Sequence, residues 1–455
     1  MLKSVLAWFA LQTLYGNASS LHAGENVNVR GMGMARTSVA DARGLDAVGI
    51  NPANLSLLGR EIMTFSVLPI TGFLSADFLT YDIYSKYLQN GSELSALSQS
   101  SKEEVLSAFD GPVGNGRVEA TARLFGMTLR IDSTKSIAFT VDYGFVGAGT
   151  FPREYARFLL DGNLPGSTFR IDGVAAEVYW HRTYELSYGM PLPTPAFLQS
   201  LSFGVGVKFV EGYGYFSLNK LTTTLVTNSS GMISGDVSML ARRVNTDGLS
   251  DPLKDFFQTS AGYGVGLDVG FTASLSENLT FGLSVTDIGS IRWTREIEEM
   301  SLDSTVTTAD PSVLTNVRSL ANSTRNGRRS IGEFSTRLPG LVRFGLAARI
   351  DRLLGAGNHD ELLAAIEYSQ GIGASAPLKG QPRISFGVEY KPTSWLPIRG
   401  GLAVTGSSSA HVALGLGLIF RSMRLDIATE DISLFLRGRS SSTGSLGMAV
   451  KILVH

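Results

Sequence analysis

The sequence predicts an all-β fold, namely a transmembrane antiparallel β-barrel of about 14 strands with an N-terminal hatch or plug segment. Three observations predict this fold. Apolar residues alternate with small or polar ones over runs long enough to cross a bilayer. Short and long connections alternate along the chain, and the first residues have the order of regions found in a secretory signal.

The composition narrows the class of protein. The chain has 455 residues, of which 17% are charged, and its formal net charge is -1. Soluble globular domains usually contain about 25% charged residues, so this chain is poor in charge. It contains no cysteine, which excludes a disulfide framework and thiolate metal sites. A near-neutral chain also lacks the electrostatic footprint of a nucleic-acid binder, so we expect no nucleic-acid partner.

Residues 1–23 are expected to form a cleaved signal peptide. Lys3 supplies a positive start, residues 4–14 an apolar stretch, and Gly16-Asn17-Ala18 the small residues of a cleavage site. A second site at Leu21-His22-Ala23 places cleavage after either Ala18 or Ala23. The alternative is an N-terminal helix of the mature fold. The signal predicts export through the periplasm, and the barrel predicts residence in the outer membrane of a Gram-negative cell.

Residues 24–59 are predicted to form the hatch. A barrel of about 14 strands has a lumen too wide for its own side chains to fill, so a compact segment must close it. The hatch motif is the Asn-Pro-Ala box with the residue after it, Asn51, Pro52, Ala53 and Asn54. Pro52 fixes one backbone angle, and the Asn51 side chain can bond nearby backbone. The alternative is an ordinary surface turn, which Asn-Pro commonly starts.

The glycine-rich stretch before this box contains two methionines. Met32 and Met34 are candidate contacts to a ligand or within the hatch, because thioethers adapt to apolar surfaces. The alternative is that they only pack. The stretch Gly31-Met32-Gly33-Met34-Ala35-Arg36, followed by Ala40-Asp41-Ala42 and Asn51-Pro52-Ala53-Asn54-Leu55, resembles the hatch region of the long-chain fatty acid transporter family.

A second resemblance covers most of the chain. Its residues are Leu79-Thr80-Tyr81-Asp82, the stretch from Gly147 to Leu160 with Asp161-Gly162-Asn163, and Gly204-Val205-Gly206-Val207-Lys208. They look like an uncharacterised family of outer-membrane barrels related to that transporter superfamily. The resemblance implies a barrel. No activity is known for the family, so the cargo stays open.

Residues 60–455 are predicted to form the barrel with long extracellular loops. Between Gly262 and Leu275, one parity is apolar and the other is glycine, serine, threonine or aspartate. Alternate side chains of a strand point to opposite faces, so one face of this strand is apolar and the other is small or polar. A soluble sandwich also hides one face, but its strands usually have about 5–6 residues. Several runs here reach the roughly 9–11 residues of a strand that crosses a bilayer.

Connection lengths are an independent indication. Tight links are expected at 132–135, 276–278 and 392–394. Long excursions are expected between them, as at 147–173 and 295–337. Short periplasmic turns and longer extracellular loops alternate in this way in outer-membrane barrels.

Aromatic residues and arginines are expected at the two membrane interfaces, where the strands end. Trp395, Tyr390 and Tyr188 are expected at the periplasmic interface and Trp293 at the outer one, since aromatic rings favour the headgroup level. Three arginines of the longest loop are candidate lipopolysaccharide contacts, because guanidinium binds phosphate in a bidentate manner. They are Arg325, Arg328 and Arg329. The alternative is a solvated loop.

No catalytic or metal-binding constellation emerges. The five histidines have no metal-ligand spacing, and the pair Ser187 and His181 is too far apart along one strand to hydrogen-bond. We therefore expect no enzyme activity, no cofactor and no metal.

Two functions from different classes remain. The first is passive transport of a hydrophobic small molecule through the plugged lumen. The second is a scaffold or docking barrel that binds an exported protein partner without transporting it. In both, the surrounding partners are outer-membrane lipid and lipopolysaccharide. A third reading, a secreted soluble β-protein, conflicts with the strand lengths.

Overall fold

The computed structural model describes most of the chain. The described residues are 27–57, 59, 61–89, 94–162, 164–244, 259–309, 328–353, 355, 360–372, 381–405 and 410–455. The predicted signal peptide, residues 1–23, and Arg325 lie outside them. Within these ranges, no helix is long and apolar enough to cross a membrane.

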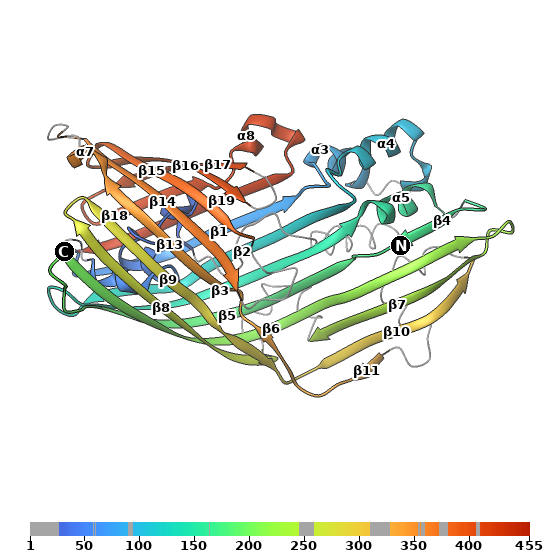
Figure 1. The fold of residues 1–455 in the computed structure, drawn as a ribbon, viewed down its shortest axis with the longest axis horizontal. Helices are drawn as coiled ribbons and strands as arrows, with labels where there is room; N and C mark the ends of the chain where they lie inside the picture. Colours follow the sequence, from blue (N-terminus) through green and yellow to red (C-terminus); the bar gives the residue numbers. More distant parts are fainter. Residues whose placement is uncertain are drawn as a thin grey trace.

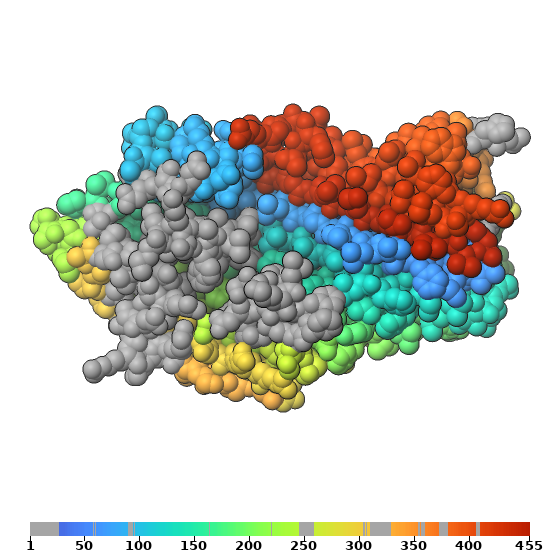
Figure 2. Space-filling view, turned by 180° about the vertical axis from the view of Figure 1, so that it is seen from behind, coloured from blue at the N-terminus to red at the C-terminus, as the bar shows by residue number. Residues whose placement is uncertain are grey.

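Fourteen antiparallel strands form a closed barrel, in agreement with the predicted number (Figure 1). Each strand pairs with the next barrel strand along the chain, and the last pairs with the first from Met63↔Val454 to Ser75↔Thr443. In Figure 2 these two strands run side by side, blue against red, along the length of the molecule. The barrel strands are β1 Met63–Ala76, β2 Val113–Arg130, β3 Ser136–Pro152, β5 Ala175–Pro191, β6 Ser200–Thr227, β8 Gly262–Ser276, β9 Leu279–Trp293, β13 Gly340–Arg349, β14 Glu361–Ile372, β15 Arg383–Thr393, β16 Leu396–Thr405, β17 Ala410–Ile419, β18 Met423–Thr429 and β19 Thr443–Val454.

Side chains alternate between the two faces of the barrel wall, as the sequence predicts. In β8, Val265 is 66% exposed and Phe271 is 39% exposed, whereas Asp268 and Thr272 are buried. The apolar residues of the strand therefore point outward and the polar residues point inward, which is the reverse of the arrangement in a soluble protein. A closed barrel with an apolar outer belt is the architecture of outer-membrane proteins, which points to the Gram-negative outer membrane.

Short connections lie at one end of the barrel, and the long ones lie at the other, where only the connection between β16 and β17, residues 406–409, is also short. The short ones join β2 to β3, β8 to β9, β15 to β16 and β17 to β18. Both ends of the barrel sequence, Met63 and Val454, lie at the short-turn end, which is periplasmic by the usual rule for such barrels. The expected alternation of connection lengths is confirmed.

The sequence predicts long outer loops, and the structure shows that several of these connections contain strands. β6 continues beyond the barrel and pairs with β7 (Ile233–Val244), which pairs with β10 (Ile297–Thr308). With β4 (Thr168–Ile171) and β11 (Arg328–Ser330), these form a projecting sheet on one side of the outer end (Figure 1). Such strands need no lipid-facing parity, so the pattern used to find barrel strands does not mark them. β12 (Phe334–Arg337) pairs with the outer end of β9.

Helices are short and occur in the N-terminal segment and at the two ends of the barrel. The longest, α4 and α5, pack at the outer end near the projecting sheet (Figure 1). The helical elements are α2 Val29–Met32, η1 Gly44–Ala47, η2 Pro52–Ser56, α3 Tyr81–Ile83, η3 Tyr84–Leu88, η4 Leu94–Ala96, α4 Gln99–Ser107, α5 Arg153–Asp161, α7 Ile350–Leu353, α8 Ser433–Arg437 and η7 Gly438–Ser440.

Candidate functional site

The N-terminal segment (residues 27–57) lies inside the barrel, in the half nearer the periplasm (Figure 1). Nearly all of its residues are buried. The Asn28 side chain accepts a hydrogen bond from the Gly31 amide at 2.8 Å and so begins α2. After α2, Ala35 and Arg36 adopt φ angles of 50° and 57°, a left-handed conformation that non-glycine residues rarely take. The segment thus turns sharply along the wall.

The Asn-Pro-Ala box is buried against β8. Asn51 and Asn54 have no exposed surface. The Asn51 amide donates to the Val39 carbonyl at 2.9 Å, the Phe271 carbonyl at 3.2 Å and the Thr272 hydroxyl at 3.0 Å. Because this box binds the wall and an earlier part of the segment together, it is not a surface turn.

A belt of wall glycines permits the close approach of the segment. A Cβ on Gly387 would lie 2.7 Å from the Met34 carbonyl oxygen, and one on Gly415 would lie 2.9 Å from the Gly33 Cα. Real Cβ atoms do not come this close to backbone, so only glycine fits at these positions. The glycine belt comprises Gly189, Gly204, Gly270, Gly282, Gly345, Gly387, Gly401, Gly415 and Gly447.

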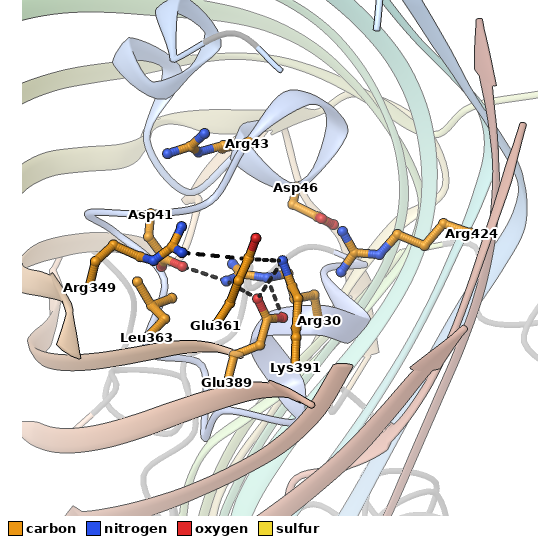
Figure 3. Close-up of a pocket in the computed structure, with 10 residues that line it drawn as sticks. All are labelled: Arg30, Asp41, Arg43, Asp46, Arg349, Glu361, Leu363, Glu389, Lys391 and Arg424. Atoms are coloured by element: carbon orange, nitrogen blue, oxygen red, sulfur yellow. Dashed lines mark hydrogen bonds and ion pairs between the residues drawn. The ribbon is translucent and has the colours of Figure 1, made fainter. Parts of the chain in front are cut away.

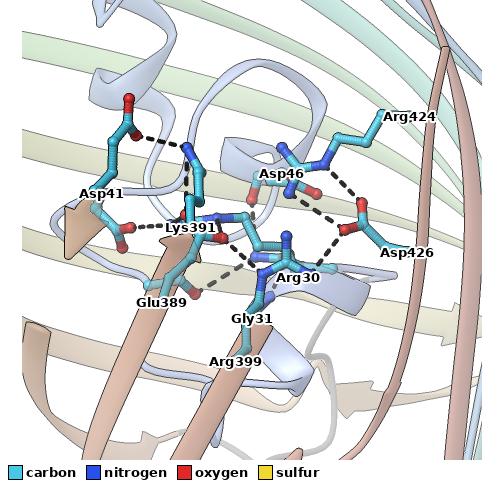
Figure 4. A network of polar contacts seen from close by, with 12 residues as sticks. Arg30, Gly31, Asp41, Asp46, Glu389, Lys391, Arg399, Arg424 and Asp426 are labelled. Atoms are coloured by element: carbon cyan, nitrogen blue, oxygen red, sulfur yellow. Dashed lines mark hydrogen bonds and ion pairs between the residues drawn. The ribbon is translucent and has the colours of Figure 1, made fainter. Parts of the chain in front are cut away.

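Buried ion pairs hold the segment to strands that lie hundreds of residues away in sequence. The hub is Glu389 of β15, which accepts from Arg30 at 3.0 and 3.2 Å and from Arg399 of β16 at 2.6 Å. Arg30 also pairs with Asp41 of the segment at 2.6 Å, and Arg399 with Asp426 of β18 at 2.9 Å (Figure 4). Removing one partner of such a buried pair usually costs about 3–5 kcal/mol, so the attachment is strong.

Further contacts continue around the wall. Arg36 pairs with Glu430 at 2.7 Å, and Lys451 of β19 pairs with Asp46 at 2.6 Å. A carboxylate oxygen of Glu367 in β14 accepts from two segment amides, those of residues 38 and 39, at 2.7 and 2.8 Å. The segment is therefore attached on several sides and does not hang from one strand.

Two cavities lie on the periplasmic side of the segment. One of about 320 Å³ is lined almost entirely by charged side chains (Figure 3). Its lining residues are Arg30, Asp41, Arg43, Asp46, Arg349, Glu361, Leu363, Glu389, Lys391 and Arg424. The other, of about 270 Å³, shares Arg43, Asp46 and Arg424 and adds apolar residues that include Leu55 and Leu57. The charged cavity is poorly suited to an apolar molecule, because entry would strip water from ionic groups without replacing it.

Two apolar clusters lie toward the outer end of the barrel. An outer apolar cluster packs α5 and neighbouring loop residues against the projecting sheet, with the rings of Phe78 and Phe151 5.4 Å apart. A second cluster, here called the Trp293 cluster, includes Tyr215 and Ile291. The sequence patterns missed both clusters, although aromatic residues in the long excursions were a usable signal.

Trp293 corrects one expectation. It was expected in the outer aromatic girdle, but it is fully buried, and its indole N–H donates to the Thr336 hydroxyl at 3.0 Å. By contrast, Trp395 is 50% exposed at the periplasmic end, as expected for an interface residue.

The wall of β9 is irregular near its middle. Asp287 has a φ of 57°, and the β8–β9 register shifts between Leu267 and Val269. On its other edge, β9 pairs with β13 up to Thr286 and with β12 from Ser290, and between these ladders the Leu338 amide donates to the Gly289 carbonyl at 3.0 Å, so regular pairing is interrupted beside Asp287. Such a bulge bends a strand and weakens local pairing.

A buried lysine lies beside this irregularity. Lys208 of β6 contacts Asp287 at 2.6 Å, Asp268 of β8 at 2.9 Å and Glu185 of β5 at 3.7 Å. One cation thus bridges three strands and the bulged residue, and it holds the interrupted part of the wall together.

The remaining sequence candidates are placed as follows. Met32 and Met34 have no exposed surface and pack on wall alanines and glycines. Arg328 begins β11, and Arg329 pairs with Glu299 of β10, so these two belong to the projecting sheet. Among the residues that the structure describes, no group of three or more histidine or acidic side chains is arranged to hold a metal ion.

Comparisons with known proteins agree with this architecture. A family model described as "Family of unknown function (DUF5723)" matches residues 68–430. Among solved structures, the chain is similar to a Pseudomonas aeruginosa FadL homologue, with 12% identity and a TM-score of 0.50 over 95% of this chain and all of that one. This match concerns the fold alone, and it agrees with the predicted barrel.

Two toluene transporters are also similar. That of Ralstonia pickettii, TbuX, has 14% identity and a TM-score of 0.45 over 95% of this chain and 99% of its own. That of Pseudomonas putida, TodX, has 11% identity and a TM-score of 0.41 over 95% and 98%. Neither score is high enough to carry an argument. No curated protein matches the chain.

Proposed function

The chain belongs to the DUF5723 family, a family of unknown function, and we propose that it is an outer-membrane barrel for passive passage of hydrophobic small molecules, with the N-terminal segment as its plug. The observation that carries the proposal is the buried, multiply anchored segment within a closed barrel. A signal peptide over residues 1–23 and cleavage after Ala18 or Ala23 remain predictions that belong with it. Residues 24–59 are then the hatch.

The outer apolar cluster supports a hydrophobic cargo. An apolar molecule that leaves water gains roughly 25 cal/mol per Å² of buried apolar surface, so it would bind among these side chains, which are at most 8% exposed in this structure, once they part to admit it. The hydrophobic molecule is the expected ligand, and Met32 and Met34 are candidate contacts if the segment moves.

The route out of the barrel is proposed to be lateral rather than periplasmic. The 320 Å³ cavity below the segment is lined by ions, which opposes transfer of an apolar molecule. The interruption beside Asp287, where Ile288 is 47% exposed on the lipid-facing side, is the proposed exit instead. Exit there requires local loosening of the β9–β13 edge and leaves the buried segment in place.

A deletion strain and two variants test the proposal. Cells that lack the protein should take up a hydrophobic fluorescent probe more slowly than cells that carry it. Asn51→Ala should change that rate, because it removes the three hydrogen bonds that join the box to the wall and to Val39. Heat-modifiable gel migration should show that the barrel still assembles. Equal probe uptake in the deletion and parent strains would rule out transport of this class.

A docking role is the second candidate, and the projecting sheet favours it. The sheet extends beyond the barrel, and its exposed residues include Ser301, Asp303 and Thr305 of β10, which give a polar surface to a protein partner. Deleting β7 and β10 should then abolish co-purification of a partner while probe uptake stays normal. The reverse result favours transport. On either reading, Arg328 and Arg329 belong to this sheet and remain proposed lipopolysaccharide contacts, together with Arg325.

A further inference from the structure

The short helix α8 exposes three consecutive apolar side chains. Leu434 is 41% exposed, Phe435 is 70% exposed and Leu436 is 75% exposed. Burying a leucine or phenylalanine side chain completely is worth about 1.5–3 kcal/mol, so three of them in water would be costly. Such a patch on a membrane protein marks a contact surface.

The helix lies over the lipid-facing side of the wall. A Cβ on Gly444 of β19 would lie 3.6 Å from the Cδ2 atom of Leu434. Gly444 belongs to the outward parity, since Ser445 is buried and Leu446 is 50% exposed. Its partner in β1, Leu74, is also exposed. Leu434 therefore lies beside the lipid belt, and the two exposed apolar residues that follow it lie at the outer rim of the barrel, where α8 is found (Figure 1).

Hydrogen bonds fix α8 in this position. Asp431 accepts from the Ser433 amide at 2.7 Å, and its other carboxylate oxygen lies 2.7 Å from Nδ1 of His411 in β17. The hydroxyls of Ser433 and Ser441 are 2.8 Å apart, which closes the loop around the helix. The exposure of the three apolar residues is thus built into the loop.

Two arginines follow the apolar residues. Arg437 and Arg439 are both exposed. The Arg439 guanidinium lies 5.6 Å from the centroid of the Tyr81 ring and 3.4 Å from the Ser85 hydroxyl. The two positive charges therefore directly follow the exposed apolar residues along the chain, a combination expected at a membrane interface.

We propose that α8 is an interfacial anchor in the outer leaflet, with its apolar residues among the acyl chains and Arg437 and Arg439 bound to lipid A phosphates. Guanidinium groups bind phosphate by paired hydrogen bonds, and exposed apolar side chains next to basic ones favour the boundary between headgroups and acyl chains. The anchor pins the outer rim between β18 and β19 to lipopolysaccharide. This proposed site is separate from the proposed lipopolysaccharide contacts at Arg328 and Arg329 in the projecting sheet.

Spin labelling measures the depth of α8, since the chain has no native cysteine. Phe435→Cys, labelled with a nitroxide in vesicles that contain lipid A, should be more accessible to oxygen than to a water-soluble nickel chelate. The lipid control is Met448→Cys on β19, which is 56% exposed, and the water control is Ser301→Cys on β10. Leu436→Cys replaces the first variant if that one does not fold. Labels at both helix positions that match the water control would overturn the proposal.

Phosphate recognition is tested separately. The double variant Arg437→Gln with Arg439→Gln should bind bisphosphorylated lipid A at least fivefold more weakly than the parent protein, and dephosphorylated lipid A equally well. Arg292→Gln is the control, because that exposed arginine already pairs with Glu333. Unchanged affinity in the double variant, or an equal loss of affinity for both lipids, would show that the two arginines do not bind the phosphate groups.

Discussion

Replacing Glu389 with glutamine isolates the attachment of the N-terminal segment. The carboxylate accepts two hydrogen bonds from Arg30 and one from Arg399, and it is 6% exposed. The amide of Glu389→Gln keeps the shape but removes the charge and part of the accepting capacity. Hydrogen bonds to charged groups contribute about 1.5–3 kcal/mol each. An amide oxygen in the place of Oε2 keeps one bond from each arginine and loses the second bond from Arg30, and the loss of the negative charge between two buried guanidinium groups brings the cost toward the roughly 3–5 kcal/mol of a broken buried pair.

Hydrogen exchange of the purified barrel measures the effect. Opening of residues 27–57 should become more frequent by about two to three orders of magnitude, since every 1.4 kcal/mol is tenfold. Barrel strands away from β15 should keep their protection. The control is Glu361→Gln in the same cavity, whose side chain is 48% exposed, so its ion pairs with Arg349 and Lys391 contribute about 0–1 kcal/mol. Equal effects of the two variants would refute the view that buried ion pairs hold the segment.

Three further predictions follow from the same contacts. Gly415→Val should displace the segment and raise permeability to large polar antibiotics, whereas Gly400→Val, where a Cβ meets nothing within 4 Å, should not; equal antibiotic sensitivity of the two strains would contradict the close-approach argument. Trp293→Phe should lower the temperature of the gel-mobility shift, because it removes a buried hydrogen bond worth about 0.5–1.5 kcal/mol; an unchanged transition would mean that this bond adds nothing. Lys208→Met leaves three carboxylates without their cation, so it should destabilise the barrel more than Lys86→Met, whose ion pair is exposed; a smaller effect at position 208 would count against the bridging role.

The barrel was predictable because its physics is local. Lipid on one face and a polar lumen on the other impose a strict alternation, and β8 displays it without interruption from Val265 to Phe271. The abundance of glycine was also informative, since the wall must admit the backbone of the segment. The Asn-Pro-Ala box lies directly before β1, and this position allowed the N-terminal segment to be predicted as a unit separate from the barrel.

The error at Trp293 has a physical cause in β9. Leu283 faces outward, and uninterrupted alternation from there would point Trp293 outward as well. The bulge at Asp287 adds one residue, so Ile288 becomes the outward side chain and Trp293 turns inward. A single left-handed aspartate leaves no mark in the pattern of apolar residues.

The ion pairs between the segment and the wall could not be predicted from the sequence, for a different reason. Arg30 and Glu389 are separated by 359 positions, and their meeting depends on barrel closure and on the path of the segment. Charged residues in lumen-facing positions could be recognised, but their partners could not. The projecting sheet was missed because strands in water obey no lipid-imposed parity.

A disulfide test addresses the central claim that the segment is fixed to the inner wall. The hydroxyls of Thr37 in the segment and Ser385 in β15 are 2.9 Å apart, so Thr37→Cys with Ser385→Cys should place two sulfurs within bonding reach. In intact outer membranes, mild oxidation should link them in most molecules and retain the segment against protease, with reversal by reductant. A pair that stays reduced while the barrel is folded would place the segment elsewhere and contradict the account.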